Sequence, residues 1–328
     1  MIEIDGFLGE GGGQIFRTAL SLSCVLGKPV RIRNIRAGRA QPGLKPQHLS
    51  VCKMLSEICG AQTQGATLGS SSVLFSPGEI RGGNYEFDIG TAGSCTLFLQ
   101  AALPALVFSG KKCALRIRGG THVQGAPTFE YFSKVFLPAA EKFGVKAEAS
   151  MARAGFYPKG GGEVLLQSCP STLSGAVFLP LREKKAHYEI ISSGIPQHVP
   201  KREEDELSRL LCNWELSGKS SEGKAISPGN SLTLWSGSIG ACSLGRIGKK
   251  AEDVAGEACC AFFSETANGS SVDLHLADQL LLYAALAEGK SRYRSSEHTS
   301  HLCSNAKVIK TMTGRNIILG EDGTVEVI

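Results

Sequence analysis

The alternation of apolar and polar positions along the chain repeats one order of elements three times. Each copy has an apolar helix, a Gly-Lys step, a short strand, a second helix and a β-hairpin. In the first copy, apolar residues at helical spacing predict helices over 14–26 and 47–59. A strand is expected over 30–35 and a hairpin through 70–75. This order reads as a βαβαββ unit.

The same order returns twice further along the chain. The second copy is predicted to contain helices over 94–108 and 128–143, a strand over 113–117 and a turn at 160–162. The third is predicted to contain helices over 274–287 and 301–312, a strand around Tyr293 and a turn at 322–323. One such unit cannot bury the apolar faces of its two helices alone, so three units are expected to pack together.

The second and third copies are separated by about 100 residues, far more than a normal connection. A small inserted α/β domain is therefore predicted over 182–268, before the helices of the third repeat. The main domain is then 1–181 together with 269–328. The predicted fold class is α/β (α+β), with three packed βαβαββ repeats and one insert.

Composition narrows the possible classes of protein. The chain has 328 residues, 42% of them hydrophobic, which is enough for a large core. No run approaches the ~20 apolar residues of a membrane span, and no N-terminal secretion signal is apparent. The eleven cysteines are scattered without a C-x-x-C pair, so we expect free thiols in a reducing cytoplasm and no zinc site.

The first candidate site is the glycine run that opens the first helix. Backbone N–H groups at a helix start bind anions, and Arg17 lies one turn further on. Glu10 would repel a bare phosphate but suits a divalent metal that bridges to phosphate. Gln14 begins the helix. A tight glycine turn with surface charges explains this stretch equally well.

Two arginines follow the first copy's strand, in a loop that enters a helix. Arg36 and Arg39 are placed to bind phosphate through their guanidinium forks, and Gln47 and His48 start the helix. A solvated charge run is the alternative for this stretch. Arg31, on the strand itself, is expected to be solvated.

Polar residues also interrupt the first helices of the other copies. Gln100 lies on an apolar helix, and Asp278 and Gln279 precede a leucine run. Each of these residues is either a site residue or a polar group that is hydrogen-bonded at the edge of the core. For Asp278 a further alternative is that its carboxylate stabilises the start of the helix.

Two histidines precede the last helix. A helix N-terminus disfavours the cation, so the neutral and nucleophilic form of His298 or His301 is populated there. Metal ligation or a plain surface role remains the alternative. The chain lacks the Rossmann and P-loop glycine patterns, which argues against hydride transfer and P-loop chemistry.

At these residues the sequence resembles the RNA 3'-terminal phosphate cyclase family. The resemblance spans nearly the whole chain. It rests on motifs in the family's order, namely 10–14 with Arg17, 35–39, 42–44 with 47–49, 93–96, 155–158 with 160–162, and 276–279. It implies the three-repeat fold with an insert.

The resemblance also implies an ATP-dependent ligase of RNA processing. A histidine nitrogen would attack ATP to give a covalent histidine–AMP, and AMP would pass to the RNA 3'-phosphate. The adjacent 2'-hydroxyl would then close a 2',3'-cyclic phosphate and release AMP. The nucleophile is assigned to His301, because 301–305 matches the family pattern, and the partners are ATP and RNA 3'-phosphate ends.

The remaining roles are carried over from the family in the same way. Glu10 would hold Mg²⁺ or Mn²⁺ on the ATP phosphates. The residues expected to bind the nucleotide or RNA phosphates are Glu10, Gln14, Arg17, Arg36, Arg39, Gln47, His48, Gln100, Pro127, His275, Leu276, Ala277, Asp278 and Gln279. His275 stands where the family leads us to expect a tyrosine.

Two rival functions fit the sequence less well. A non-catalytic relative acting in ribosome assembly should lack both the histidine and the Glu-Gly-Gly-Gly-Gln loop, and both are present. An enolpyruvyl transferase, also built from βαβαββ units, would need six copies.

Overall fold

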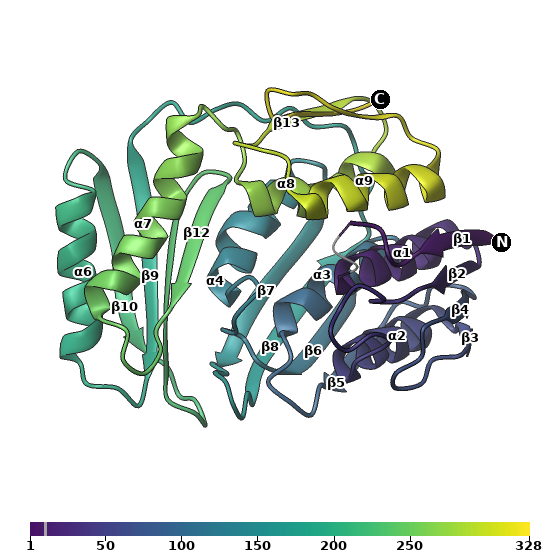
Figure 1. Cartoon of the computed structure of the whole chain (residues 1–328), viewed down its shortest axis with the longest axis horizontal. Coiled ribbons are helices and arrows are strands. Elements are labelled where there is room, and N and C mark those ends of the chain that lie inside the picture. Colours follow the sequence, from purple (N-terminus) through teal and green to yellow (C-terminus); the bar gives the residue numbers. More distant parts are fainter. Residues whose placement is uncertain (10–11) are drawn as a thin grey trace.

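The computed structural model describes residues 1–9 and 12–328. It is a mixed α/β protein with three four-stranded sheets and one smaller sheet, as the predicted class requires. Figure 1 shows the group of α6, α7 and β9 to β12 on the left, the second sheet at the lower centre, the first at the right and β13 at the top. In the part of the chain that is described, no helix is both long and apolar enough to cross a membrane.

The first sheet has the strand order β1-β2-β4-β3. Its strands are β1 (Ile2–Asp5), β2 (Val30–Arg33), β3 (Gln62–Gln64) and β4 (Val73–Ser76). β1 and β2 are parallel and the other pairs are antiparallel. Helices α1 (Gly13–Leu26) and α2 (Pro46–Cys59) belong to this unit. β2 ends two residues before the prediction, because Asn34 and Arg36 turn the backbone with φ of 52° and 56°.

The second sheet repeats this order as β5-β6-β8-β7. Its strands are β5 (Asn84–Asp88), β6 (Cys113–Gly119), β7 (Lys146–Arg153) and β8 (Gly162–Cys169), and its first helix is α3 (Cys95–Val107). The second helix, predicted as one unit, runs through α4 (Phe129–Tyr131), a π-helical turn (Phe132–Phe136) and α5 (Leu137–Glu141). The π turn has no signature in the apolar spacing.

The third sheet is smaller, with the order β13-β15-β14. Its elements are α8 (Leu274–Leu286), β13 (Ser291–Arg294), α9 (Ser300–Thr313), β14 (Ile317–Leu319) and β15 (Thr324–Val327). Two parallel bridges, Ser174 to Glu288 and Val177 to Arg292, place residues 174–177 beside β13. This segment holds the place that β1 and β5 hold in their sheets.

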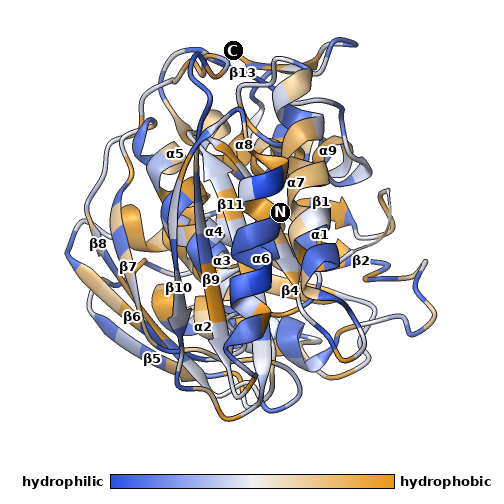
Figure 2. Ribbon diagram, turned by 90° about the vertical axis from the view of Figure 1, so that its left-hand side faces the viewer, coloured by the Kyte–Doolittle hydropathy of each residue, from blue (hydrophilic) through white to orange (hydrophobic). Residues whose placement is uncertain are grey.

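Residues 185–267 form a separate sheet with the order β10-β9-β11-β12. The elements are β9 (Lys185–Ser193), α6 (His198–Leu210), β10 (Glu215–Glu222), β11 (Gly229–Ser236), β12 (Ile239–Leu244) and α7 (Ala251–Ala267). Apolar residues of this group form their own buried cluster, and α6 turns a hydrophilic face outward (Figure 2). The domain limits 182 and 268 stay a prediction.

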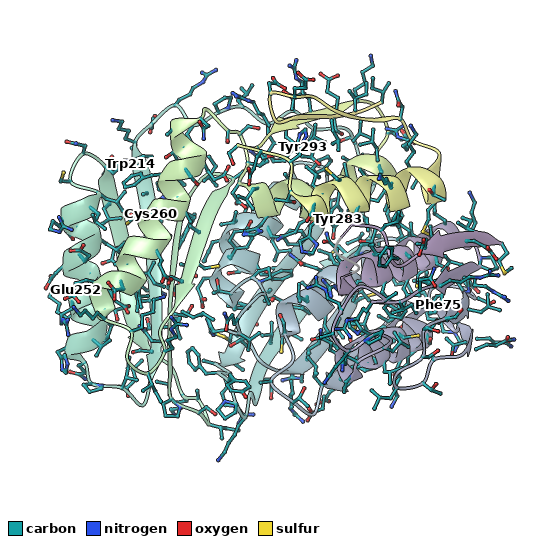
Figure 3. All side chains as sticks on the ribbon, viewed as in Figure 1. Phe75, Trp214, Glu252, Cys260, Tyr283 and Tyr293 are labelled. Atoms are coloured by element: carbon teal, nitrogen blue, oxygen red, sulfur yellow. The ribbon has the colours of Figure 1, made fainter. Side chains whose placement is uncertain are left out.

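The main core lies where the helices of the three other sheets meet. Phe16, Phe75 and Tyr283 are among its largest fully buried side chains, and Figure 3 shows Tyr283 and Tyr293 beside α8 and Phe75 in the first sheet. Ser21 of α1 donates to the carbonyl of Ala101 in α3 at 2.6 Å. This contact ties α1 to α3 within the core.

Candidate active site

Gly9 and Gly12, which precede α1, lie against the start of α9. A Cβ on Gly12 would be 3.4 Å from Cε1 of His301 and 3.7 Å from a guanidinium nitrogen of Arg39. A Cβ on Gly9 would be 1.9 Å from Oγ of Ser304. The two ends of the chain therefore meet here, and the glycines leave room that any other side chain would fill.

Asp278 is the buried carboxylate of this region. Gln14 of α1 donates to Oδ2, and Asn305 of α9 donates to Oδ1 at 2.7 Å. Burial raises the pKa of Asp278, while these two donors and electrostatic interactions with His301 and Arg17 oppose the rise. One carboxylate thus ties together three helices that are far apart in the sequence.

Arg17 stands one turn into α1 and faces the same region. Burial lowers the pKa of its guanidinium to about 10, and the charge of Asp278 opposes that fall. Arg17 is still a cation at neutral pH and is partly removed from water. A positive charge in such a place attracts a phosphate more strongly than an exposed one does.

His48 presents an unused donor to the glycine loop. Its Nδ1 accepts the backbone N–H of Lys45 at 3.0 Å, so the neutral ring carries its proton on Nε2. Burial, with the charges of Arg17 and Arg36, lowers the pKa of His48 to about 3. Nε2 is buried with no partner among the described residues and would lie 2.3 Å from a Cβ on Gly13.

The two loop arginines have different surroundings. Arg36 donates to the carbonyls of Gln41 at 2.7 Å and Gly43 at 3.1 Å, so part of its guanidinium holds the loop in shape. Burial and the charge of Arg39 lower the pKa of Arg36. Arg39 is more exposed and lies beside Gly12. Gln47 is exposed at the second residue of α2.

The remaining nucleotide candidates lie on α3 and α8. Gln100 donates to Gln279 at 2.7 Å, which joins the two helices by their polar side chains. The carbonyl of Pro127 accepts from Thr96 of α3 at 2.7 Å. His275 is exposed. Leu276 and Ala277 are fully buried, so their side chains pack in the core.

His301 lies in the first turn of α9 with an exposed side chain, and Thr299 caps the helix. His298 precedes the cap and is partly buried, and its Nε2 has no partner in the described part of the chain. Glu10, the predicted metal ligand, lies outside the described residues. Within 1–9 and 12–328, no three His, Cys, Asp or Glu side chains gather as a metal site.

Sequence reasoning overlooked Asp273, which caps α8. Its carboxylate accepts the N–H of His275 at 3.0 Å and of Leu276 at 2.9 Å. It also accepts the hydroxyl of Tyr131 and the N–H of Gly240 in β12. An aspartate directly before an apolar helical run is an N-cap signal that was available in the sequence.

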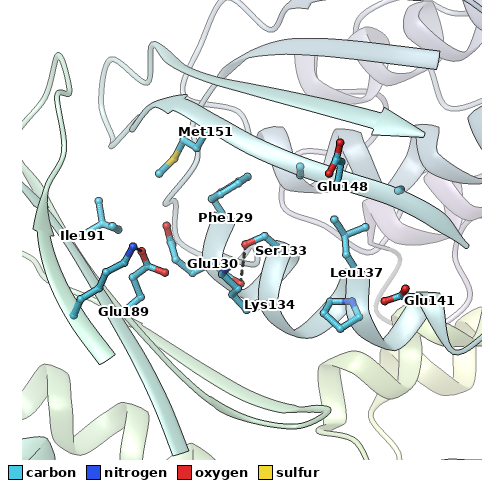
Figure 4. Close-up of a pocket in the computed structure, with 14 residues that line it drawn as sticks. Phe129, Glu130, Ser133, Lys134, Leu137, Glu141, Glu148, Met151, Glu189 and Ile191 are labelled. Atoms are coloured by element: carbon cyan, nitrogen blue, oxygen red, sulfur yellow. Dashed lines mark hydrogen bonds and ion pairs between the residues drawn. The ribbon is translucent and has the colours of Figure 1, made fainter. Parts of the chain in front are cut away.

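A cavity of about 380 Å³ lies elsewhere, between the helix of 129–141, β7 and β9 (Figure 4). Phe129, Leu137 and Ile191 give it apolar walls, and Lys219 and Glu189 form an ion pair at 3.1 Å at its edge. None of the predicted site residues lines it. The convergence of glycine loop, arginines and histidine is therefore separate from this cavity.

Comparison with known proteins places these features in a family. A family model described as RNA 3'-terminal phosphate cyclase matches residues 8–319. A protein of that name from Archaeoglobus fulgidus is 42% identical over 317 residues, 96% of either chain. A second, from Methanosarcina mazei, is 41% identical over 327 residues, 93% of either chain.

A third relative of the same name, from Caldivirga maquilingensis, is 42% identical and covers 97% of this chain and 94% of its own. Among solved structures, the enolpyruvyl transferase NikO from Streptomyces tendae matches with a TM-score of 0.30 and 15% identity. That match covers 64% of this chain and 38% of NikO.

Proposed function

The chain belongs to the RNA 3'-terminal phosphate cyclase family, and we propose that it uses ATP to convert an RNA 3'-terminal phosphate into a 2',3'-cyclic phosphate. Family membership over almost the full length supports this activity. The observation that carries its chemistry is the position of His301 against Gly12, at the glycine loop that opens α1.

The proposed reaction has three balanced steps. An imidazole nitrogen of His301 attacks the α-phosphorus of ATP, a nitrogen–phosphorus bond forms, and pyrophosphate leaves. An oxygen of the RNA 3'-phosphate then attacks the same phosphorus, which breaks the bond to histidine and gives RNA-(3')pp(5')A. Finally the 2'-hydroxyl oxygen attacks the 3'-phosphorus, loses its proton and displaces AMP. Proximity assists this last step, because the hydroxyl is already on the same ribose.

The cationic and donor groups around the glycine loop are proposed to bind the phosphates. Arg17 and Arg39 supply charge, and Nε2–H of His48 supplies a neutral donor aimed at the loop. The N–H groups at the start of α1 add to them. Arg36 would act in part through the loop that it holds.

Asp278 is proposed to position His301 through the helices that it joins. Its bonds to Gln14 and Asn305 set α1 and α9 against α8, and α9 bears His301. Gln100 and Gln279, joined to each other, would border the nucleotide with Pro127, Gln47 and His275.

A divalent cation, Mg²⁺ or Mn²⁺, is proposed with Glu10 as its ligand. Such an ion would neutralise the triphosphate so that a nitrogen can approach it. This assignment rests on the sequence resemblance, and none of the steps above depends on a position for the metal.

We also propose three βαβαββ repeats, at 1–181 and 269–328, with 182–268 inserted into the third. The shared strand order of the first two sheets supports this division, as does the position of 174–177 beside β13. The separate buried cluster supports an insert with a core of its own.

Labelling with α-³²P-ATP tests the function. The wild type should retain an acid-labile, base-stable label after denaturation, His301→Ala should lose it, and His298→Ala should keep it. RNA with a 3'-phosphate should then discharge the label and end in a cyclic phosphate. If the wild type acquired no covalent label, the proposed enzymatic activity would be wrong, and a non-catalytic RNA-binding role would be favoured.

A further inference from the structure

The motif at 155–162 has no place in the proposed reaction, yet it presents an exposed aromatic ring. Tyr157 is 77% exposed, more than any other aromatic side chain in the described chain. Its neighbour Phe156 is buried and stacks on His122 with ring centroids 5.1 Å apart. Tyr157 therefore adds little to the core, and its position needs another explanation.

The backbone on both sides of Tyr157 is firmly held. Phe156 accepts the N–H of Gly160 at 2.8 Å, and the N–H of Lys159 donates to Ser227 of the insert at 3.2 Å. A Cβ on Gly160 would lie 2.9 Å from the backbone of Ala92. Three segments thus fix the turn while the tyrosine ring stays in solvent, so little order would be lost when a ligand binds the ring.

The charges on the turn and on the facing 223–228 segment are positive. The carboxylates that adjoin these segments are Glu163, which pairs with Arg116 and Arg118, and the exposed Glu222. Residues 153–162 and 223–228 contain Arg153, Lys159 and Lys224 and no carboxylate. The two lysines are exposed, and neither has an ion-pair partner within the described residues. Ile226, which would lie 2.4 Å from a Cβ on Gly161, adds an exposed apolar side chain.

The turn lies at the same end of the second sheet as the loop that enters α3. Gly162 pairs with Gly119 at the end of β6, and Gly160 lies against the 90–94 loop. About 8 Å of helix separates the start of α3 from Gln100, which bonds Gln279. The surface is therefore offset from the proposed nucleotide site and lies on its insert side.

We propose that Tyr157, Arg153, Lys159, Lys224 and Ile226 form a platform for single-stranded RNA upstream of the reacting 3' end. Exposed aromatics among cations bind unpaired strands by stacking on bases and by contacts to phosphate. An RNA end at His301 would reach this platform only with further nucleotides. The inference rests on the proposed function for the identity of the strand.

The experiment compares two single-stranded substrates with 3'-phosphates, a dinucleotide and a 15-mer. Tyr157→Ala should raise the KM of the 15-mer about 5- to 100-fold and leave the KM of the dinucleotide and enzyme adenylation unchanged. Tyr157→Phe should have the wild-type KM for the 15-mer. Phe108→Ala is the matched control, since this ring is 37% exposed at the other end of α3.

Salt dependence gives a second readout. Lys159→Ala should reduce the slope of log KM for the 15-mer against log salt by about 0.7. The platform would be overturned if Tyr157→Ala changed the KM of both substrates equally or changed neither. It would also be overturned if Tyr157→Phe failed to restore the KM of the 15-mer. A wild type that is not adenylated would reject the proposed function itself, so the two failures are distinguishable.

Discussion

Asn305 of α9 donates a 2.7 Å hydrogen bond to Oδ1 of Asp278 in α8, and Gln14 of α1 donates to the other oxygen. Both donors are side-chain amides, so both depend on a carboxylate that accepts on each side. Electrostatic interactions with His301 and Arg17 also act on this carboxylate. The negative charge of Asp278 and the two hydrogen bonds that it accepts can therefore be tested separately.

Asp278→Asn keeps the size of the side chain but turns one oxygen into an NH₂ group that faces a donor. Losing a hydrogen bond to a charged group costs about 1.5–3 kcal/mol, so enzyme–AMP formation should fall about 10- to 100-fold. The rate of covalent labelling from α-³²P-ATP measures this. Asp322→Asn, an exposed turn carboxylate that bonds Thr324, is the control and should label normally. Normal labelling of Asp278→Asn would show that the carboxylate does not help to position His301.

The helices of this site follow from apolar spacing and end signals in the sequence. α1 ends at Gly27 and α2 at Gly60, both in the left-handed conformation typical of glycine caps. Such local signals depend only on neighbouring residues, so their limits were predicted to within one residue. The meeting of Gly12 with His301 is a long-range contact between residues near opposite ends of the chain, so such local signals do not specify it.

Other features could not be predicted because their causes are not local. β10 is polar along its length and has no alternation, since it is an edge strand held by pairing with β9. The roles of Tyr131 and Gly240 at Asp273 arise only when α4 and β12 meet the start of α8.

Gly13→Ala should weaken ATP binding without unfolding the protein. The new Cβ would lie 2.3 Å from Nε2 of His48, so that ring must move and its proton no longer points at the glycine loop. Overpacking of this kind costs about 1–3 kcal/mol, and the KM for ATP in the labelling reaction should rise about 5- to 100-fold.

Gly256→Ala is the matched control for this glycine. Gly256 lies inside α7 with nothing within 4 Å of an added Cβ. Alanine there should raise the free energy of unfolding by about 0.5–1 kcal/mol and leave the KM for ATP unchanged. An unchanged KM in Gly13→Ala would show that His48 does not contact the nucleotide.

Glu203 of α6 should make the insert less stable as the pH rises. Its Oε1 accepts from Asn230, but Oε2 is buried without a partner among the described residues. Burial raises the pKa of Glu203 from 4.5 to about 7, against the opposing effects of Asn230 and Lys249. The folded protein thus holds this proton more tightly than the unfolded chain between pH 4.5 and 7.

The contribution of Glu203 to the free energy of unfolding therefore falls as the pH rises from 4.5 to 7, by about 3 kcal/mol at most. Above pH 7 this contribution no longer changes. Glu203→Gln should remove this dependence and exceed the wild type in stability at pH 8 but not at pH 4.5. Both tryptophans, Trp214 and Trp235, lie in the insert, so their fluorescence in urea follows its unfolding. Glu206→Gln is the control, because its pKa is lowered by Arg209 and its loss should not stabilise the insert at pH 8. If wild type and Glu203→Gln keep the same difference in stability at pH 4.5 and 8, the carboxyl group is ionised in the folded insert and the argument from its burial is wrong.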